Sequence, residues 1–140
     1  MMRTLGLDLG DARIGIATGD PMGIIATGYE TYRRCGDESR DVQYIADLAK
    51  RLQAGLIVIG LPVNMDGTDG VRVEKSRAFG ERLAQICDCK IDYQDERLTT
   101  VMGERMLIDA GMRRDKRKQV IDKIAATIIL QSYLDSHALR

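Results

Sequence analysis

The sequence predicts a mixed α/β fold, in which helices cover a sheet that contains both antiparallel and parallel strands. Two observations lead to this prediction. Three strand-like segments follow one another within residues 5–32, and after them short apolar runs alternate with amphipathic helices. At 140 residues, the chain is expected to form a single domain over residues 1–140.

The first stretch, Leu5–Ala17, is expected to form a tight hairpin around which the rest of the fold is arranged. Apolar residues lead up to Asp8, the chain turns at Gly10 and Asp11, and apolar residues resume at Ile14. Asp8 is therefore predicted at the end of a strand, on the turn side of the sheet.

The next three elements follow from composition and spacing. Residues 24–32 contain β-branched and aromatic residues, which favours a third strand. A helix is expected from about residue 40 to Gly55, because apolar residues recur there every three or four positions. Leu56–Ile59 is short and continuously apolar, which is typical of a parallel strand buried on both faces.

The second half of the chain continues the alternation. A polar loop over Val63–Gly70 leads to a helix at about Val71–Cys87 and to a strand at Cys89–Gln94. A further helix is expected over residues 99–111, and a closing helix over about residues 119–134.

Three acidic residues far apart in the chain are candidates for one catalytic site. Asp8 and Glu96 each lie at a predicted strand end, and Asp122 begins an apolar row on the closing helix, formed by Ala125, Ala126, Ile129 and Tyr133. Each acid alone has an ordinary alternative: a turn hydrogen bond for Asp8, a surface ion pair for Glu96, and a favourable helix-dipole position for Asp122.

Together the three carboxylates would predict a divalent-metal site. Converging carboxylates repel one another unless a cation lies between them, and Mg²⁺ or Mn²⁺ prefers oxygen ligands. Such ions can stabilise the attacking and leaving oxygens in phosphodiester hydrolysis. Asp8, Glu96 and Asp122 are thus predicted to be both the metal ligands and the catalytic residues.

Several basic and polar residues are candidates for substrate contact. Five of the six residues from 113 to 118 are basic, and they precede the closing helix, where they could contact phosphates beside the cleavage site. A solvated charged loop is the alternative interpretation. The complete candidate set is Arg13, Asn64, Arg113, Arg114, Lys116, Arg117 and Lys118.

Composition excludes several other classes of function. Lys plus Arg and Asp plus Glu both number 21, so general charge attraction to nucleic acid is not expected. The three cysteines, Cys35, Cys87 and Cys89, lack the partners of a zinc site, and His137 is the only histidine. No apolar run is long enough to span a membrane, and a strand is expected close to the amino terminus. We therefore predict a cytoplasmic protein.

Four segments, in this order and spacing, resemble the YqgF family. They are Gly6-Leu7-Asp8-Leu9-Gly10 leading to Arg13-Ile14-Gly15, then Gly60-Leu61-Pro62-Val63-Asn64-Met65-Asp66-Gly67, Asp95-Glu96-Arg97-Leu98-Thr99-Thr100, and Ile121-Asp122-Lys123-Ile124-Ala125-Ala126. The resemblance implies a ribonuclease H-like fold with a mixed five-stranded sheet and flanking helices. It also implies that Asp8, Glu96 and Asp122 occupy the acidic positions of the family.

The function implied by this resemblance is that of a nuclease that processes the 5′ end of pre-16S ribosomal RNA, or of a resolvase of branched DNA junctions. Two positions depart from the family: Gly19 stands where serine is frequent, and Ala125 and Ala126 stand where related resolvases carry a further acid. The second departure implies a second metal site that is weaker or completed by substrate.

Two further interpretations remain at this point. One is a binding module with the same fold that does not cleave nucleic acid. The other is a nucleotide-binding hairpin like that of sugar kinases, although those proteins use two such lobes. The chain is expected to be a monomer or a homodimer.

Overall fold

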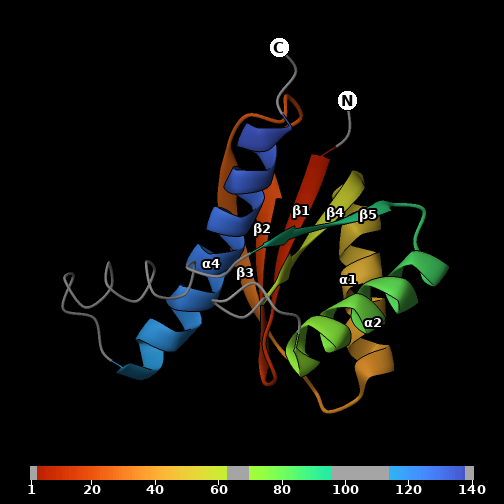
Figure 1. Cartoon of the computed structure of the whole chain (residues 1–140), viewed down its shortest axis with the longest axis vertical. Coiled ribbons are helices and arrows are strands. Elements are labelled where there is room, and N and C mark those ends of the chain that lie inside the picture. Colours follow the sequence, from red (N-terminus) through yellow and green to blue (C-terminus); the bar gives the residue numbers. More distant parts are fainter. Residues whose placement is uncertain (1–2, 63–69, 96–113, 138–140) are drawn as a thin grey trace.

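The computed structural model describes residues 3–62, 70–95 and 114–137, with side chains in the last segment from residue 120 onward. Five strands form one sheet in the order β3-β2-β1-β4-β5, shown in Figure 1. Their bounds are β1 Arg3–Leu9, β2 Arg13–Gly19, β3 Ala26–Arg33, β4 Ala54–Leu61 and β5 Lys90–Asp95. The described helices are α1 Glu38–Arg51, α2 Val71–Ile86 and α4 Arg114–Ser136.

The sheet is mixed, as predicted. β1, β2 and β3 form an antiparallel meander, while β4 and β5 run parallel to β1. The carboxyl ends of the three parallel strands therefore meet at one edge of the sheet. In α/β sheets, ligands bind at this edge.

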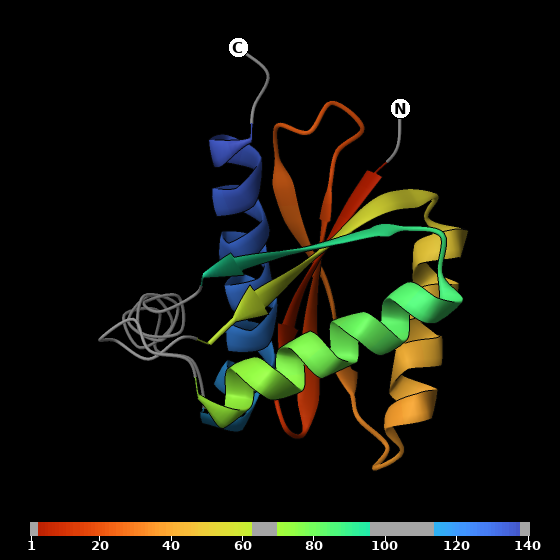
Figure 2. The same cartoon turned by 45° about the vertical axis from the view of Figure 1, so that its right-hand side comes forward.

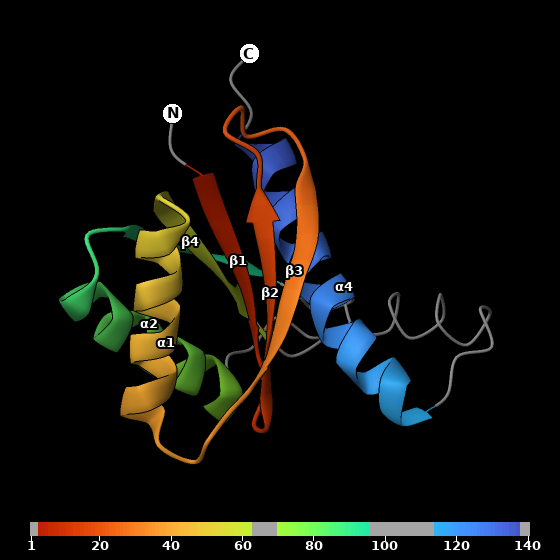
Figure 3. The same ribbon diagram turned by 180° about the vertical axis from the view of Figure 1, so that it is seen from behind.

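Helices cover the two faces of the sheet, so that the molecule has three layers. α1 and α2 lie on one face and α4 on the other, as Figures 2 and 3 show from two sides. The core under α1 and α2 includes Leu5, Leu7 and Ile59, all fully buried. The core under α4 includes Val58, Ala126 and Leu130. Because side chains alternate along a strand, each central strand contributes to both cores.

The structure corrects the bounds of four elements. The helix predicted to reach Gly55 ends at Arg51, because Gln53 turns the chain with a φ of 57° and Gly55 already lies in β4. Ile24 and Ile25 do not belong to the third strand but lie in the turn before it, with 58% and 59% of their surfaces exposed. β4 is longer than the predicted strand at both ends. α4 begins at Arg114, so most of the basic run lies within its first turns and does not precede it. Arginine and lysine are good helix formers, and a charged run without apolar periodicity does not exclude a helix. The predicted helix over residues 99–111 lies outside the described residues.

A buried carboxylate ties the end of β3 to α1. Asp41 is 1% exposed and accepts hydrogen bonds from the Tyr32 hydroxyl at 2.9 Å, from Arg34 Nε at 2.9 Å and from the Cys35 backbone N–H at 3.4 Å. Burial raises the pKa of Asp41, but the donors, Arg34 first, outweigh it and hold the pKa below its ordinary value.

Removing this carboxylate should destabilise the fold in a pH-dependent way. We expect Asp41→Ala to lower the free energy of unfolding at neutral pH by about 2 kcal/mol, because Arg34 loses its buried partner but keeps some solvent contact. Because its pKa is lower in the folded state, the Asp41 carboxylate stabilises the fold at pH values above its unfolded pKa of about 4. This stabilisation is lost as the pH falls through the pKa of Asp41 in the folded state. Urea unfolding at several pH values should therefore show the difference from wild type shrinking in acid. Exposed Asp47, replaced by alanine, is the control, and an equal loss in both variants would contradict the assignment.

No helix within the described part of the chain is both long and apolar enough to cross a membrane.

Candidate metal centre at the carboxyl end of β1

Asp8 is the penultimate residue of β1 and is partly buried. Its neighbours Leu7 and Leu9 belong to the core under α1 and α2. Asp8 therefore projects from the opposite face of the sheet, the face that α4 covers. The same alternation applies to Gly6, where an added Cβ would lie 2.7 Å from the Cβ of Leu130 in α4. The predicted position of Asp8, at a strand end beside the β1–β2 turn, agrees with this structure.

Gly15 brings Asp122 to Asp8. It is the register partner of Asp8 on β2, and an added Cβ at Gly15 would lie 1.9 Å from the backbone oxygen of Asp122. No side chain fits in that space, so α4 rests directly on the backbone of β2. Paired residues on antiparallel strands lie about 4.5 to 5.5 Å apart. Asp8 and Asp122 thus lie in the same corner of the molecule, although 114 positions separate them in the sequence.

The apolar row that follows Asp122 explains why the helix can approach so closely. Ala125, Ala126 and Ile129 are each no more than 1% exposed, and Tyr133 is 6% exposed. Small side chains at the start of the row allow the helix axis to lie near the sheet. The predicted inward orientation of this row is confirmed.

Arg13 also belongs to this corner. Its Nε donates to Asp122 Oδ2 at 2.6 Å, and the two side chains are 32% and 17% exposed. This ion pair engages Oδ2 of Asp122. Arg13 is predicted from the sequence as a substrate contact, whereas its ion pair with an acid of the candidate site is not.

The ends of β4 and β5 complete the edge. Leu61 pairs with Asp95, the last residue of β5. Asp92 of β5 lies on the α4 face, since it accepts a hydrogen bond from the Tyr133 hydroxyl at 2.6 Å. This hydrogen bond, more than the opposing effect of burial, holds the pKa of Asp92 below its ordinary value.

The structure does not describe the side chains of several predicted site residues. Glu96, Asn64 and Arg113 lie outside the described residues, and for Arg114, Lys116, Arg117 and Lys118 the structure describes only the helical backbone. Within the described residues, no three His, Cys, Asp or Glu side chains come together as a metal site. The structure therefore brings together two of the three predicted acids and adds Arg13 to them.

The donors in this corner fit a hard divalent cation. Asp8 and Asp122 supply carboxylate oxygens from two different elements, and Asp122 keeps part of its surface open to solvent. Mg²⁺ binds through one or two carboxylates, with water and phosphate oxygens as its other ligands. Two carboxylates at the open edge of a sheet therefore meet the minimum requirement for such an ion.

The strand order and the helices on both faces define an α/β protein with a ribonuclease H-like fold, as predicted. The model of the RuvX family, described as Holliday junction resolvase, matches residues 2–136. The chain belongs to this family, which is the YqgF family that the sequence motifs indicate. Membership of this family makes it a hydrolase of the nuclease class.

Relatives of similar length support this assignment. A protein of Halalkalibacterium halodurans named "Putative pre-16S rRNA nuclease" is 51% identical over 140 residues, covering 99% of this chain and 100% of its own. A protein of the same name from Streptococcus thermophilus is 47% identical, covering 96% and 98%. The solved structure of T. thermophilus RuvC in complex with Holliday junction substrate is 11% identical, with a TM-score of 0.59 and coverage of 97% and 95%. That last similarity concerns the fold alone.

Proposed function

We propose that this protein is a divalent-metal-dependent endonuclease that cleaves structured nucleic acid and processes the 5′ end of pre-16S rRNA in the cytoplasm. The observation that carries the proposal is the meeting of Asp8 and Asp122 at the carboxyl end of β1, with Gly15 as the contact between strand and helix. The names of the full-length relatives supply the substrate.

In this proposal, Asp8, Asp122 and Glu96 hold Mg²⁺ or Mn²⁺. Glu96 directly follows Asp95, the residue that ends β5 at the same edge of the sheet as Asp8. When bound, such an ion acts as a Lewis acid on the phosphate and lowers the pKa of water. Arg13 orients the Asp122 carboxylate through its 2.6 Å ion pair.

Substrate binding is proposed to involve the basic start of α4. Arg114, Lys116, Arg117 and Lys118 lie in the turns of this helix that precede Asp122. Arg113 and Asn64 complete the proposed set. Such residues would bind phosphates on either side of the cleaved bond and fix the position of the strand without reading its sequence.

The proposal predicts that cleavage depends strictly on a divalent cation. We expect the purified protein to cut a pre-16S rRNA transcript in Mg²⁺ or Mn²⁺ and to lose this activity in excess EDTA, with recovery when the cation is restored. Gel analysis of a labelled transcript and of a four-way DNA junction, treated side by side, measures this. Activity that persists in EDTA would contradict the metal mechanism.

Two other functions each have an observation in their favour. The family description favours resolution of a DNA junction, and cutting of the junction in preference to the RNA would support it. The ion pair between Arg13 and Asp122 favours a binding module that does not cleave, because a cation of the protein already occupies one oxygen of the acid. Tight binding of both substrates without cleavage of either would support the module.

A further inference from the structure

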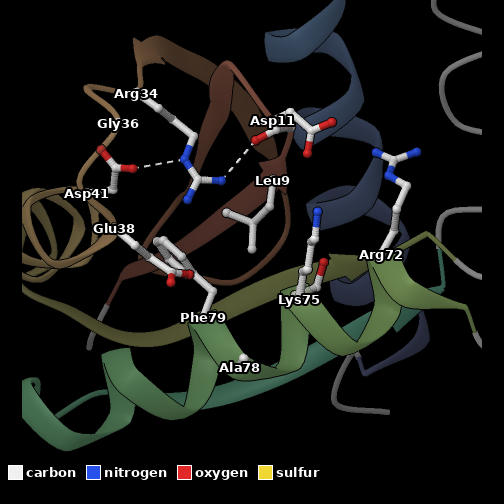
Figure 4. Close-up of a pocket in the computed structure, with 12 residues that line it drawn as sticks. Leu9, Asp11, Arg34, Gly36, Glu38, Asp41, Arg72, Lys75, Ala78 and Phe79 are labelled. Atoms are coloured by element: carbon white, nitrogen blue, oxygen red, sulfur yellow. Dashed lines mark hydrogen bonds and ion pairs between the residues drawn. The ribbon is translucent and has the colours of Figure 1, made fainter.

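A cavity of about 390 Å³ opens beside the end of β1, on the face of the sheet opposite Asp122. Its walls are the β1–β2 turn, the loop that follows β3, and α2, as Figure 4 shows. Leu9 lines the cavity and directly follows Asp8 in the strand. The cavity and the candidate metal centre thus lie on the two sides of one strand end.

The α2 wall is a single stripe of side chains. Arg72, Lys75, Ser76 and Phe79 line the cavity at spacings of three and four, so they share one face of the helix. Ser76 is 3% exposed and Phe79 is 1% exposed, so these two side chains form the buried part of the α2 wall. Arg72 and Lys75 are exposed and extend from α2 toward the β1–β2 turn (Figure 4).

These two cations differ from the third cation of the cavity. Arg34 is neutralised, since its Nε donates to Asp41 at 2.9 Å and its Nη1 donates to the Gly10 carbonyl at 2.9 Å. Neither Arg72 nor Lys75 makes an ion pair with any described residue. Within the part of the chain that the structure describes, the cavity thus carries two positive charges without an ion-pair partner.

The position of these charges is also unfavourable for the helix itself. Both lie close to the amino terminus of α2, where the helix dipole disfavours cations. The first turn contains one acid, Glu74, and the N-cap residue Gly70 has no side chain to cap the helix. The helix dipole therefore does not account for Arg72 and Lys75, whereas an anionic ligand would.

The acids of the cavity restrict what this ligand can be. Asp41 is paired with Arg34 and Glu38 with Arg82, whereas Asp11 stands on the turn opposite α2 (Figure 4). A ligand that fits both walls is anionic at one end and carries hydrogen-bond donors at the other. A nucleotide has this polarity, and the volume lies in the range of small-molecule pockets.

We propose that this cavity binds one nucleotide of the substrate strand, next to the bond cleaved at Asp8. The phosphate contacts Arg72 and Lys75, and Asp11 accepts a hydrogen bond from the sugar or the base. The inference rests on the proposed nuclease function, because the cavity adjoins the metal centre through Leu9. It adds a second contact surface, separate from the basic start of α4.

Binding of a fluorescein-labelled single-stranded oligoribonucleotide of about 12 nucleotides tests the proposal. Fluorescence anisotropy in EDTA, across a series of salt concentrations, compares wild type with Arg72→Gln/Lys75→Gln. We expect binding about 10-fold weaker, and a slope of log affinity against log salt smaller by about 0.7, since one phosphate contact on a single strand is lost and each contributes about 0.7. The melting temperature should not fall, because the lost charges oppose the helix dipole.

Lys50→Gln/Arg51→Gln is the matched control. It removes the same charge from the last turn of α1, which precedes the start of β4 and so lies at the opposite edge of the sheet. We expect its affinity and salt slope to equal those of wild type. Equal affinity and slope in the two double variants would overturn the proposal, and so would a lower melting temperature of Arg72→Gln/Lys75→Gln that accounts for its weaker binding.

Failure of this inference can be distinguished from failure of the proposed function. Asp8→Asn should bind the oligoribonucleotide at least as tightly as wild type, since it keeps Arg72 and Lys75 and removes a negative charge that would repel the strand. If wild type cleaves no substrate but Arg72→Gln/Lys75→Gln still weakens binding, the nuclease proposal fails and the cavity remains a nucleotide site. If cleavage is metal-dependent and its KM is unchanged in this variant, the inference fails and the nuclease proposal stands.

Discussion

Replacement of Asp8 by asparagine is expected to reduce the rate of cleavage by about a thousandfold, with no loss of stability. Asparagine has nearly the same shape but lacks the negative charge with which the carboxylate would hold a divalent cation. A metal acting as a Lewis acid is worth several kcal/mol in the transition state, and about 4 kcal/mol corresponds to a thousandfold in rate. Single-turnover cleavage of the pre-16S rRNA transcript at saturating Mg²⁺ measures the change.

The control for this variant is Asp47→Asn. Asp47 lies on the exposed face of α1 and accepts a hydrogen bond from Gln43. The Asp47→Asn variant therefore removes one negative charge, as Asp8→Asn does, but away from the candidate site. Its rate should equal that of wild type, and thermal unfolding should show both variants folded. A rate for Asp8→Asn within a few-fold of this control, with a metal ion still bound, would exclude Asp8 as a catalytic ligand.

Much of the fold could be predicted because its signals are local. The helix expected over residues 71–87 matches α2, since apolar periodicity is a property of neighbouring residues. The start of the third strand was harder to predict from the sequence. Ile24 and Ile25 have the composition of a strand, but their backbone N–H groups donate to Asp20 Oδ1, and Gln131 of α4 binds the Ile24 carbonyl. The Asp20 hydrogen bonds are local, but the contact with Gln131 spans 107 residues, and local pattern cannot reveal it.

The same limit applies to the candidate site. Asp8 could be predicted as a site residue from its place at a strand end, and Asp122 from the apolar row that follows it on a helix. The backbone contact that brings these two acids together could not be predicted from the sequence. A glycine inside a strand indicates close approach of another backbone but does not name it, and here the partner of Gly15 is Asp122. The ion pair of Arg13 with Asp122 is hidden for the same reason, as it joins residues 109 positions apart.

The Gly15 contact leads to the second large expected effect. Gly15→Ala would place a methyl group 1.9 Å from the Asp122 carbonyl oxygen and 2.4 Å from its carbon. Backbone atoms cannot rotate away as a side chain can, so α4 must move outward from the sheet. Overpacking of this kind costs about 1 to 3 kcal/mol, occasionally more. We expect a loss near the upper end, which corresponds to a fall of roughly 10 °C in melting temperature for a domain of this size.

Activity should fall further than stability explains. The displacement carries Asp122 away from Asp8, and a shift of about 1 Å at a reacting centre can cost a hundredfold in rate. The measurement is cleavage at a temperature where circular dichroism shows the variant fully folded. Under that condition, the remaining loss of rate reports the separation of the two acids.

Gly28→Ala is the matched control for this effect. Gly28 lies on β3 and also faces α4, but an added Cβ there would meet Thr127 Oγ1 at 3.3 Å and Lys123 Cβ at 3.6 Å. The Thr127 hydroxyl need yield by only a few tenths of an ångström, and 3.6 Å is an ordinary van der Waals contact, so stability and rate should stay close to wild type. If Gly15→Ala behaves like Gly28→Ala in both measurements, then Gly15 does not set the position of α4. The two acids would in that case owe their proximity to the apolar row of α4 alone.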